Sequence, residues 1–192
     1  MEKNTVAKYL HKGEKICWSS QPEKFPLLEK SCKFSVLLNW SITSAVTVLF
    51  LGYYFLVLCN GTFSPVFVGL TLLIAATIMY MPVRKYKNLQ DAQYYITNER
   101  AMLVTRDASY YCLNLKELTN VQNVQDNAGK TCLILGTGLE KSLKRGIDWR
   151  SRNIEPSIST EGPWDYVHSL LFFRAKDTNG ALEVLHQIGV SA

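Results

Sequence analysis

The chain has 192 residues, 19% of them charged, and a formal net charge of +5, averages that would suit a soluble protein. The charges are unevenly distributed, because residues 34–83 contain no Asp, Glu, Lys, Arg or His. A helix of a soluble protein keeps polar residues on its solvent face. The composition therefore excludes a chain that is water-soluble throughout, and it predicts a membrane segment.

Residues 1–33 are polar and charged, and they precede the apolar segment. The apolar run begins too late for a typical cleavable leader, so we expect a retained anchor. Residues 4–11 are a candidate for a short helix, and residues 16–20 read as a strand. This segment is too short to fold alone, so we expect it to add a strand to a cytosolic domain formed mainly by residues 84–192.

The charge-free segment 34–83 is long enough for two crossings, since one transmembrane helix needs about 20 apolar residues. Turn-forming residues gather near its middle, at Asn60, Gly61, Ser64 and Pro65. We predict a helical hairpin with spans at about residues 34–58 and 65–81. Pro82 and the following cations are expected to end the second span.

Small and hydroxylated residues recur four apart in the first span, at Ser41 and Ala45 and at Thr43 and Thr47. They would either let two helices approach closely or satisfy their hydroxyl groups on the preceding helical turn. Neither span contains Asp, Glu, Lys, Arg or His, and ion pathways usually need such a residue inside the membrane. The hairpin is therefore interpreted as an anchor in the lipid bilayer.

Cations flank the hairpin on both sides, whereas the turn between the spans carries no charge. By the positive-inside rule, this pattern places both termini in the cytoplasm and makes the chain a multi-pass protein of the cytoplasmic membrane. The cations concerned are Lys24, Lys30, Lys33, Arg84, Lys85 and Lys87.

The segment after the hairpin has a β pattern, with strands about ten residues apart. This rhythm predicts an antiparallel sheet that packs on itself or closes. A long insertion at residues 136–167 interrupts it with glycines, prolines, tryptophans and many charges. The predicted strands are at residues 94–97, 101–105, 109–115, 121–125, 131–135 and 169–173.

An amphipathic helix is predicted near the end of the sequence. Residues 177–179 offer helix caps, and Gly189 can stop the helix. Between them, apolar side chains recur at helical spacing and must be buried against the sheet, so the helix is expected to cover it. Those side chains are Ala181, Val184, Leu185 and Ile188.

Two short motifs, in this order around the hairpin, resemble the family of bacterial membrane-anchored pleckstrin-homology-like (PH-like) proteins. The resemblance covers about residues 10–136 and 168–189, and the insertion 136–167 departs from it. It implies an α+β membrane protein of the inner membrane, with a strongly bent antiparallel β-sheet or barrel capped by a C-terminal helix. It implies no catalytic residues. The motif residues are Gly13, Glu14, Trp18 and Pro22, then Tyr94, Thr97, Asn98 and Arg100.

The motif residues themselves suggest structural roles. Asn98 suits the turn between two predicted strands, because Asn tolerates positive φ. Arg100 is expected to pair with a carboxylate or a strand end, and we favour this role over ligand binding.

A basic loop lies inside the insertion, with five cations against Asp148 alone. Held near a bilayer, it would contact anionic headgroups, each cation contributing about 1 kcal/mol. The alternative is a solvated loop whose tryptophan packs on its own domain. The residues assigned to headgroup contact are Lys141, Lys144, Arg145, Trp149, Arg150 and Arg152.

No catalytic, cofactor or metal motif is recognisable. The five cysteines are an odd number without C-x-x-C spacing, which favours buried reduced thiols. His11, His168 and His186 lack the spacing of metal ligands. Nucleic-acid binding would suit the positive charge, but membrane apposition explains the cations more simply.

We therefore expect a non-catalytic, membrane-anchored interaction or assembly module with a protein partner or a second copy of the chain. An anionic-lipid sensor using residues 141–152 is the alternative. An unrecognised membrane-associated enzyme is a further one.

Overall fold

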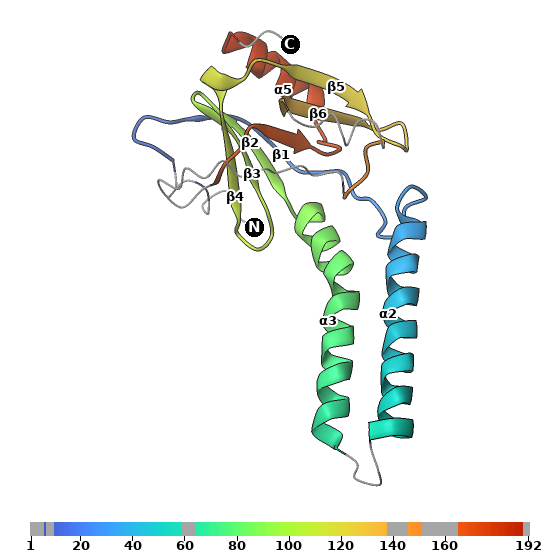
Figure 1. Ribbon diagram of the computed structural model, residues 1–192. Coiled ribbons are helices and arrows are strands. Elements are labelled where there is room, and N and C mark those ends of the chain that lie inside the picture. The colour runs from blue at the N-terminus through green and yellow to red at the C-terminus, as the bar shows by residue number, and fades with distance from the viewer. Residues whose placement is uncertain (1–5, 7–9, 59–63, 138–145, 151–164, 190–192) are drawn as a thin grey trace. The chain divides into compact units, whose positions relative to one another are not determined.

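The computed structural model describes residues 6, 10–58, 64–137, 146–150 and 165–189 (Figure 1). The chain is α+β and divides into two compact units. One is Phe25–Lys87, which contains the apolar hairpin. The other combines Met1–Lys24 with Asn88–Ala192 and contains the β-sheets.

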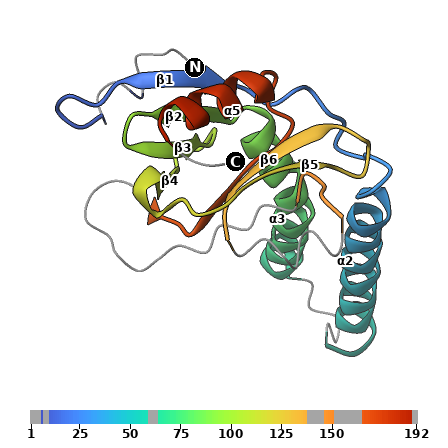
Figure 2. The same cartoon turned by 90° about the horizontal axis from the view of Figure 1, so that it is seen from above.

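Two long helices form the hairpin unit. Helix α2 (Lys33–Tyr53) continues into a single π-helical turn, η1 (Tyr54–Leu58), and α3 (Pro65–Gln90) follows. The helices lie side by side (Figures 1 and 2). Trp40 of α2 donates from Nε1 to the carbonyl of Met79 on α3 at 2.9 Å, and the Tyr54 ring stacks on Phe67 at 4.4 Å.

Helix α3 runs through Pro82 to Gln90, so the prediction that it ends near residue 81 was wrong. Proline has no N–H, and the carbonyl of Ile78 loses one intrahelical donor. That is a single break in the hydrogen-bond ladder, and apolar helices tolerate it where neighbouring groups compensate. The polar residues after Pro82 then form further helical turns that the sequence pattern had not indicated.

The hydroxyl groups of Thr43 and Thr47 decide between the two interpretations for this pair of residues. Thr43 donates to the carbonyl of Asn39 at 2.8 Å, and Thr47 donates to the carbonyl of Thr43 at 2.7 Å. Both hydroxyl groups therefore donate to a carbonyl on the preceding turn of their own helix, as in the second interpretation.

Two sheets form the other unit. Neighbouring strands are antiparallel, except that β7 runs parallel to β4. Strand β1, from before the hairpin, pairs with β2, from after it. The first sheet has the order β1 (Ile16–Ser20), β2 (Gln93–Thr97), β3 (Arg100–Val104), β4 (Tyr110–Asn114), β7 (Asp165–Tyr166). The second has the order β5 (Val121–Gln125), β6 (Thr131–Gly136), β8 (Ser169–Phe172).

The chain segments that follow β1 and β8 connect the two sheets. The N–H of Glu23 donates to the carbonyl of Arg174 at 2.7 Å, and the N–H of Lys176 donates to Gln21 at 3.0 Å. Pro22 forms an antiparallel bridge with Ala175 between them. Hydrogen bonding therefore continues from one sheet into the other along this seam.

Helix α5 (Thr178–Gln187) packs against β1, β2 and β6. The Asp177 side chain caps it by accepting from the N–H of Gly180 at 2.9 Å, and Gly189 at φ +90° follows its end. The side chains of Ala181 and Leu185, on the inner face of this helix, are fully buried. The expected helix is present with its apolar stripe against the sheets.

Two expected regions lie mostly outside the described residues. Of the N-terminal helix at 4–11, only residues 6, 10 and 11 are described, and of the insertion only 136, 137, 146–150 and 165–167. The sequence did not indicate β7, which is only two residues long. It also did not indicate the short 3-10 helix η2 (Leu115–Glu117) between β4 and β5.

Candidate functional site

A buried ion pair joins the two sequence motifs. Arg100 opens β3, and Glu14 lies just before β1. The guanidinium donates from Nε to Oε1 and from Nη2 to Oε2 of Glu14, both at 2.9 Å. The side chains are 2% and 0% exposed. The carboxylate partner that the sequence led us to expect for Arg100 is therefore Glu14.

Two further donors complete the environment of this carboxylate. Thr97 donates from Oγ1 to Oε1 of Glu14 at 2.8 Å, and the backbone N–H of His11 donates to Oε2 at 2.8 Å. Each oxygen thus accepts two hydrogen bonds. A buried ion pair is favourable only when its remaining polar groups are satisfied, and this arrangement meets that condition.

The same contacts set the protonation of the pair. Burial by itself would raise the pKa of Glu14, but hydrogen bonds from Arg100, His11 and Thr97 and the charge of Arg100 hold that pKa below its ordinary 4.5. Burial likewise opposes the charged guanidinium, yet hydrogen bonding to Glu14 raises the pKa of Arg100. Both groups are therefore charged at neutral pH.

His11 connects this pair to the β2–β3 turn. Its Nδ1 lies 3.1 Å from Oε2 of Glu99 and 4.0 Å from Oε2 of Glu14. The three ligand atoms lie within 4.8 Å of one another, a spacing that a divalent cation could use. Because four donors already occupy the Glu14 oxygens, the arrangement fits a hydrogen-bond network better than a metal centre.

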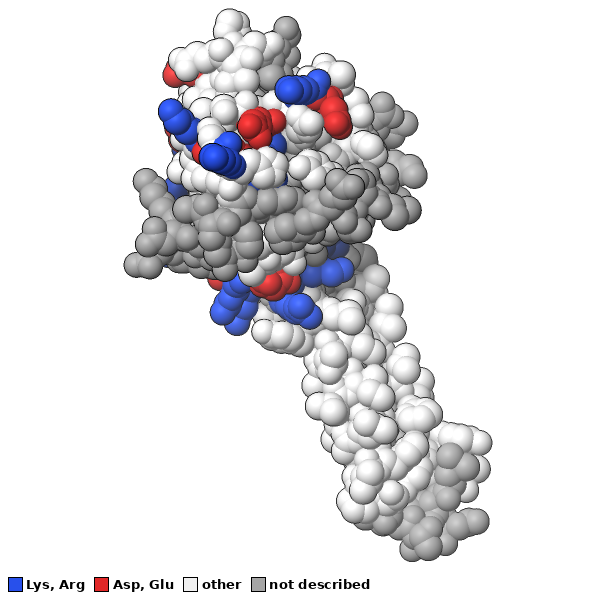
Figure 3. Space-filling view, turned by 90° about the vertical axis from the view of Figure 1, so that its left-hand side faces the viewer, with Lys and Arg blue, Asp and Glu red and all other residues white. Residues whose placement is uncertain are grey.

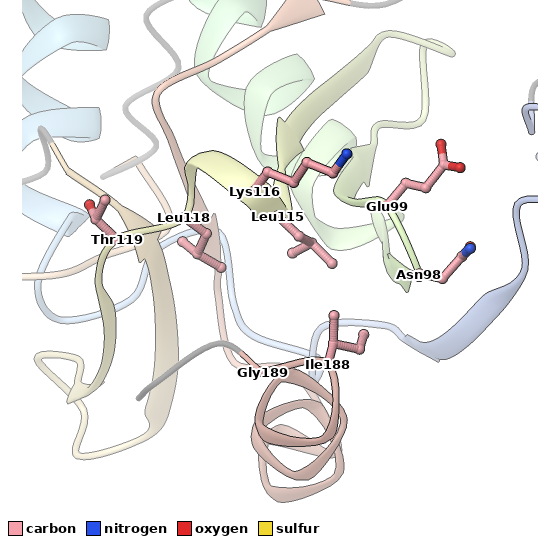
Figure 4. Close-up of a pocket in the computed structure, with 8 residues that line it drawn as sticks. All are labelled: Asn98, Glu99, Leu115, Lys116, Leu118, Thr119, Ile188 and Gly189. Carbon is pink, nitrogen blue, oxygen red and sulfur yellow. The ribbon is translucent and has the colours of Figure 1, made fainter.

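Two adjoining pockets flank this network, and Glu99 and Lys116 line both of them. The larger has a volume of about 510 Å³ and lies where the end of α5, the β2–β3 turn and η2 meet (Figure 4). The smaller has a volume of about 240 Å³. The larger is lined by Asn98, Glu99, Leu115, Lys116, Leu118, Thr119, Ile188 and Gly189, and the smaller by His11, Glu99, Arg100, Asn114, Lys116 and Tyr166.

The larger pocket has an apolar centre and a charged rim. Ile188 points from the helix end toward Leu115, with Leu118 beside them (Figure 4). Leu115 and Leu118 are buried, whereas Lys116 is exposed. Glu99 has His11 as a partner, but no described residue pairs with the ammonium group of Lys116. An apolar group with an acidic neighbour is the chemistry that this pocket could receive.

A third pocket, of about 330 Å³, lies near the start of α5. Two of its cations already have partners, since Lys130 pairs with Glu23 at 3.0 Å and Arg174 pairs with buried Asp126. The exposed cation Lys176 also lines this pocket, and no described residue pairs with its ammonium group.

The other motif residues serve the architecture. Trp18 stacks on Phe172 with centroids 5.8 Å apart and donates from Nε1 to Asp177 at 3.2 Å. The hydroxyl of Tyr94 donates to the carbonyl of Phe173 at 3.0 Å. Asn98 accepts at Oδ1 from the N–H of Lys15 at 2.8 Å. Gly13 adopts φ +94°, the region that favours glycine.

The basic loop is only partly within the described residues. Trp149 is 2% exposed, so its ring packs inside the protein and offers no surface to a headgroup. Arg150 pairs with Asp148 at 3.0 Å. The burial of Trp149 favours the alternative in which the tryptophan packs within the protein. Four assigned cations lie outside the described residues: Lys141, Lys144, Arg145 and Arg152.

Sequence reasoning did not assign the apolar residues and the lysine of the larger pocket to a site. Leu115, Lys116 and Leu118 lie in the connection between β4 and β5, and Ile188 lies seventy residues after Leu118, directly after the end of α5. Ile188 was assigned only to the buried stripe of its helix. No local pattern relates these positions, because only the packing of α5 brings them together.

Comparisons with known proteins do not extend this picture: no protein family, curated protein or solved structure matches the chain.

Proposed function

We propose that the chain is anchored in a membrane by its helical hairpin and acts as a non-catalytic interaction or assembly module. In this proposal the β unit is a PH-like domain at the cytoplasmic face of the inner membrane. Its partner is another protein or a second copy of the chain.

The observation that carries the membrane anchor is the exposure of the apolar helices. Lys33–Val57 and Pro65–Gln90 are long and apolar enough to cross a membrane, and almost none of their most apolar residues are buried within the protein. Large side chains such as Leu49, Leu56 and Val66 are more than two-thirds exposed. On the face that Figure 3 shows, coloured charges gather toward one end of the hairpin, and the rest of its described surface is white.

Exposed apolar surface of this extent is unfavourable in water, at roughly 25 cal/mol per Å². A helix in the core of a soluble protein avoids this cost by being buried. Lipid would remove it for α2 and α3 while their backbones stay hydrogen-bonded internally. The exposed apolar surface of α2 and α3 therefore favours a lipid bilayer as the environment of the hairpin.

Two features of the β unit support an interaction role. Among the described residues, β5 pairs only with β6, so one of its edges has no described strand partner. Such edges bind extended segments of other proteins through backbone hydrogen bonds. The pocket at Lys116 lies just before this strand in the chain.

The membrane anchor is tested by fractionating cells that make the full chain. We expect the protein in the membrane pellet after alkaline carbonate washing and in solution only with detergent. Replacing Leu49 and Leu73 by Arg should release part of it, since an Arg at a helix centre costs about 2.5–3.5 kcal/mol. Gln122→Arg with Asn123→Arg on β5 is the matched control and should stay in the pellet.

The interaction role is tested on the detergent-purified chain. We expect light scattering after gel filtration to give either a homo-oligomer or a stoichiometric complex with a co-purifying protein. A monodisperse monomer without a partner would contradict this part of the proposal.

A further inference from the structure

We propose that the pocket around Lys116 binds a peptide segment of the partner that inserts one apolar side chain and places a carboxylate next to Lys116. This inference rests on the proposed function, because it names the partner chemistry of the same module. It concerns the larger of the two adjoining pockets.

The apolar part of the proposal follows from the three side chains at the pocket centre. Leu115, Leu118 and Ile188 converge there (Figure 4). Leu115 and Leu118 are buried and Ile188 is half-buried, so together they form an apolar base against which one inserted side chain would pack. Sites for cofactors and drug-sized molecules bury most of their ligand, which an open pocket with only three apolar side chains does not. A protruding side chain of a protein partner is the occupant that this shape fits.

The acidic part follows from the charges at the rim. Glu99 is 3.1 Å from His11, and Arg100 is committed to Glu14. Lys116 is the rim cation for which the described residues provide no partner. Charge complementarity at an interface favours an opposite charge at this position, and the side chain of Asp or Glu supplies it.

The peptide nature of the occupant follows from the neighbouring strand. Thr119 lines the pocket, and β5 begins two residues later with an edge that has no described partner. An extended peptide could hydrogen-bond along β5 while its apolar side chain enters the pocket. A lipid headgroup or a nucleotide would use the charge of Lys116 without using this edge.

The test is a titration of the full chain in detergent micelles, with methyl-labelled Leu and Ile, against capped peptides. The probe is Gly-Leu-Asp-Gly. We expect shifts of the Leu115, Leu118 and Ile188 methyl signals. Replacing Leu by Ser in the peptide should abolish them. Replacing Asp by Lys should weaken binding about threefold, the size expected of one exposed ion pair.

Two protein variants complete the test. Lys116→Glu should reverse the preference, so that Gly-Leu-Lys-Gly binds better than Gly-Leu-Asp-Gly. Ile188→Ser, at a half-buried position at the helix end, should weaken both peptides. Absence of methyl shifts, or shifts that do not follow the sign of the charge at residue 116, would overturn the proposal.

The purified complex separates this inference from the proposed function. If a complex forms and Lys116→Glu weakens its affinity, both stand. If the complex forms with the same affinity in Lys116→Glu and Ile188→Ser, the pocket proposal is wrong and the interaction role remains. If the chain is a monomer that nevertheless binds the peptide as described, the pocket stands and the assembly role fails.

Discussion

Glu14 and Arg100 are 86 positions apart in the sequence and form the most enclosed charged contact among the described residues. Breaking a buried pair leaves one charge without compensation, which typically costs about 3–5 kcal/mol. Removing both charges avoids that penalty. Because Glu14 precedes the hairpin and Arg100 follows it, the pair holds the segment before the hairpin against the strands after it.

We expect Arg100→Met to lower the free energy of unfolding by about 3–5 kcal/mol. Glu14→Gln should destabilise in the same direction, since it leaves the guanidinium buried. The double variant should lose clearly less than the sum of the two single changes. Thermal and denaturant unfolding of the full chain in detergent measures this cycle. Additive losses would show that the two side chains do not interact.

A pH dependence follows from the lowered pKa of Glu14. A carboxyl whose pKa is lower in the folded than in the unfolded state adds stability above its unfolded pKa, here near 4.5. That stability is lost as the pH falls through the folded pKa. We therefore expect the free energy of unfolding to decrease as the pH drops below about 4.5.

Glu14→Gln is the control for this titration. Asp107, whose pKa is also lowered, acts in the same direction and remains in the variant. The difference between the two pH profiles therefore isolates Glu14. Parallel profiles for the wild type and the variant would contradict the assignment.

At the scale of elements, the two helices of the hairpin meet through specific contacts. The indole of Trp40 donates across to α3, whereas the hydroxyls of Thr43 and Thr47 donate within α2. Hydrogen bonds between membrane helices contribute about 0.6 kcal/mol on average and up to about 1.7 kcal/mol.

Trp40→Phe should consequently weaken the helix pair by about 0.6–1.7 kcal/mol, because the carbonyl of Met79 loses its donor. Thr43→Val is the matched comparison and should change helix pairing by less, since its lost bond lies within one helix. Unfolding of the hairpin in detergent or bicelles measures both. A larger loss for Thr43→Val than for Trp40→Phe would contradict this account.

Helix α3 shows that a proline in the sequence does not always end a helix. A proline signals a helix end in most contexts, but here the helix continues for eight residues beyond Pro82. The lost hydrogen bond concerns one carbonyl, and the following residues have helical partners of their own. Strand β5 coincides with its predicted range, and the turn-forming residues 126–129 mark its end in the sequence.

At the scale of the whole molecule, the proposed orientation depends on the cations that flank the hairpin. Both termini are expected on the cytoplasmic side. Replacing the five cations Lys30, Lys33, Arg84, Lys85 and Lys87 by Gln and adding Lys at positions 60 and 62 should invert the chain in part of the population. Protease protection of terminal epitope tags measures this.

Protease protection of the unmodified chain also tests the hairpin anchor. Both tags should be protected, or both cleaved, together in vesicles of known orientation. Tags that report opposite sides would show a single crossing and would contradict the hairpin anchor.

The sequence by itself determined the apolar hairpin, most strands and the final helix, because charge depletion and periodicity are local signals. It also indicated that Arg100 would pair with a carboxylate or a strand end. Only the tertiary structure identified Glu14 as that partner, gathered Leu115, Leu118 and Ile188 around Lys116, and placed Trp149 inside the protein. These outcomes depend on contacts between residues far apart in the chain, and no local pattern encodes which distant side chains packing will bring together.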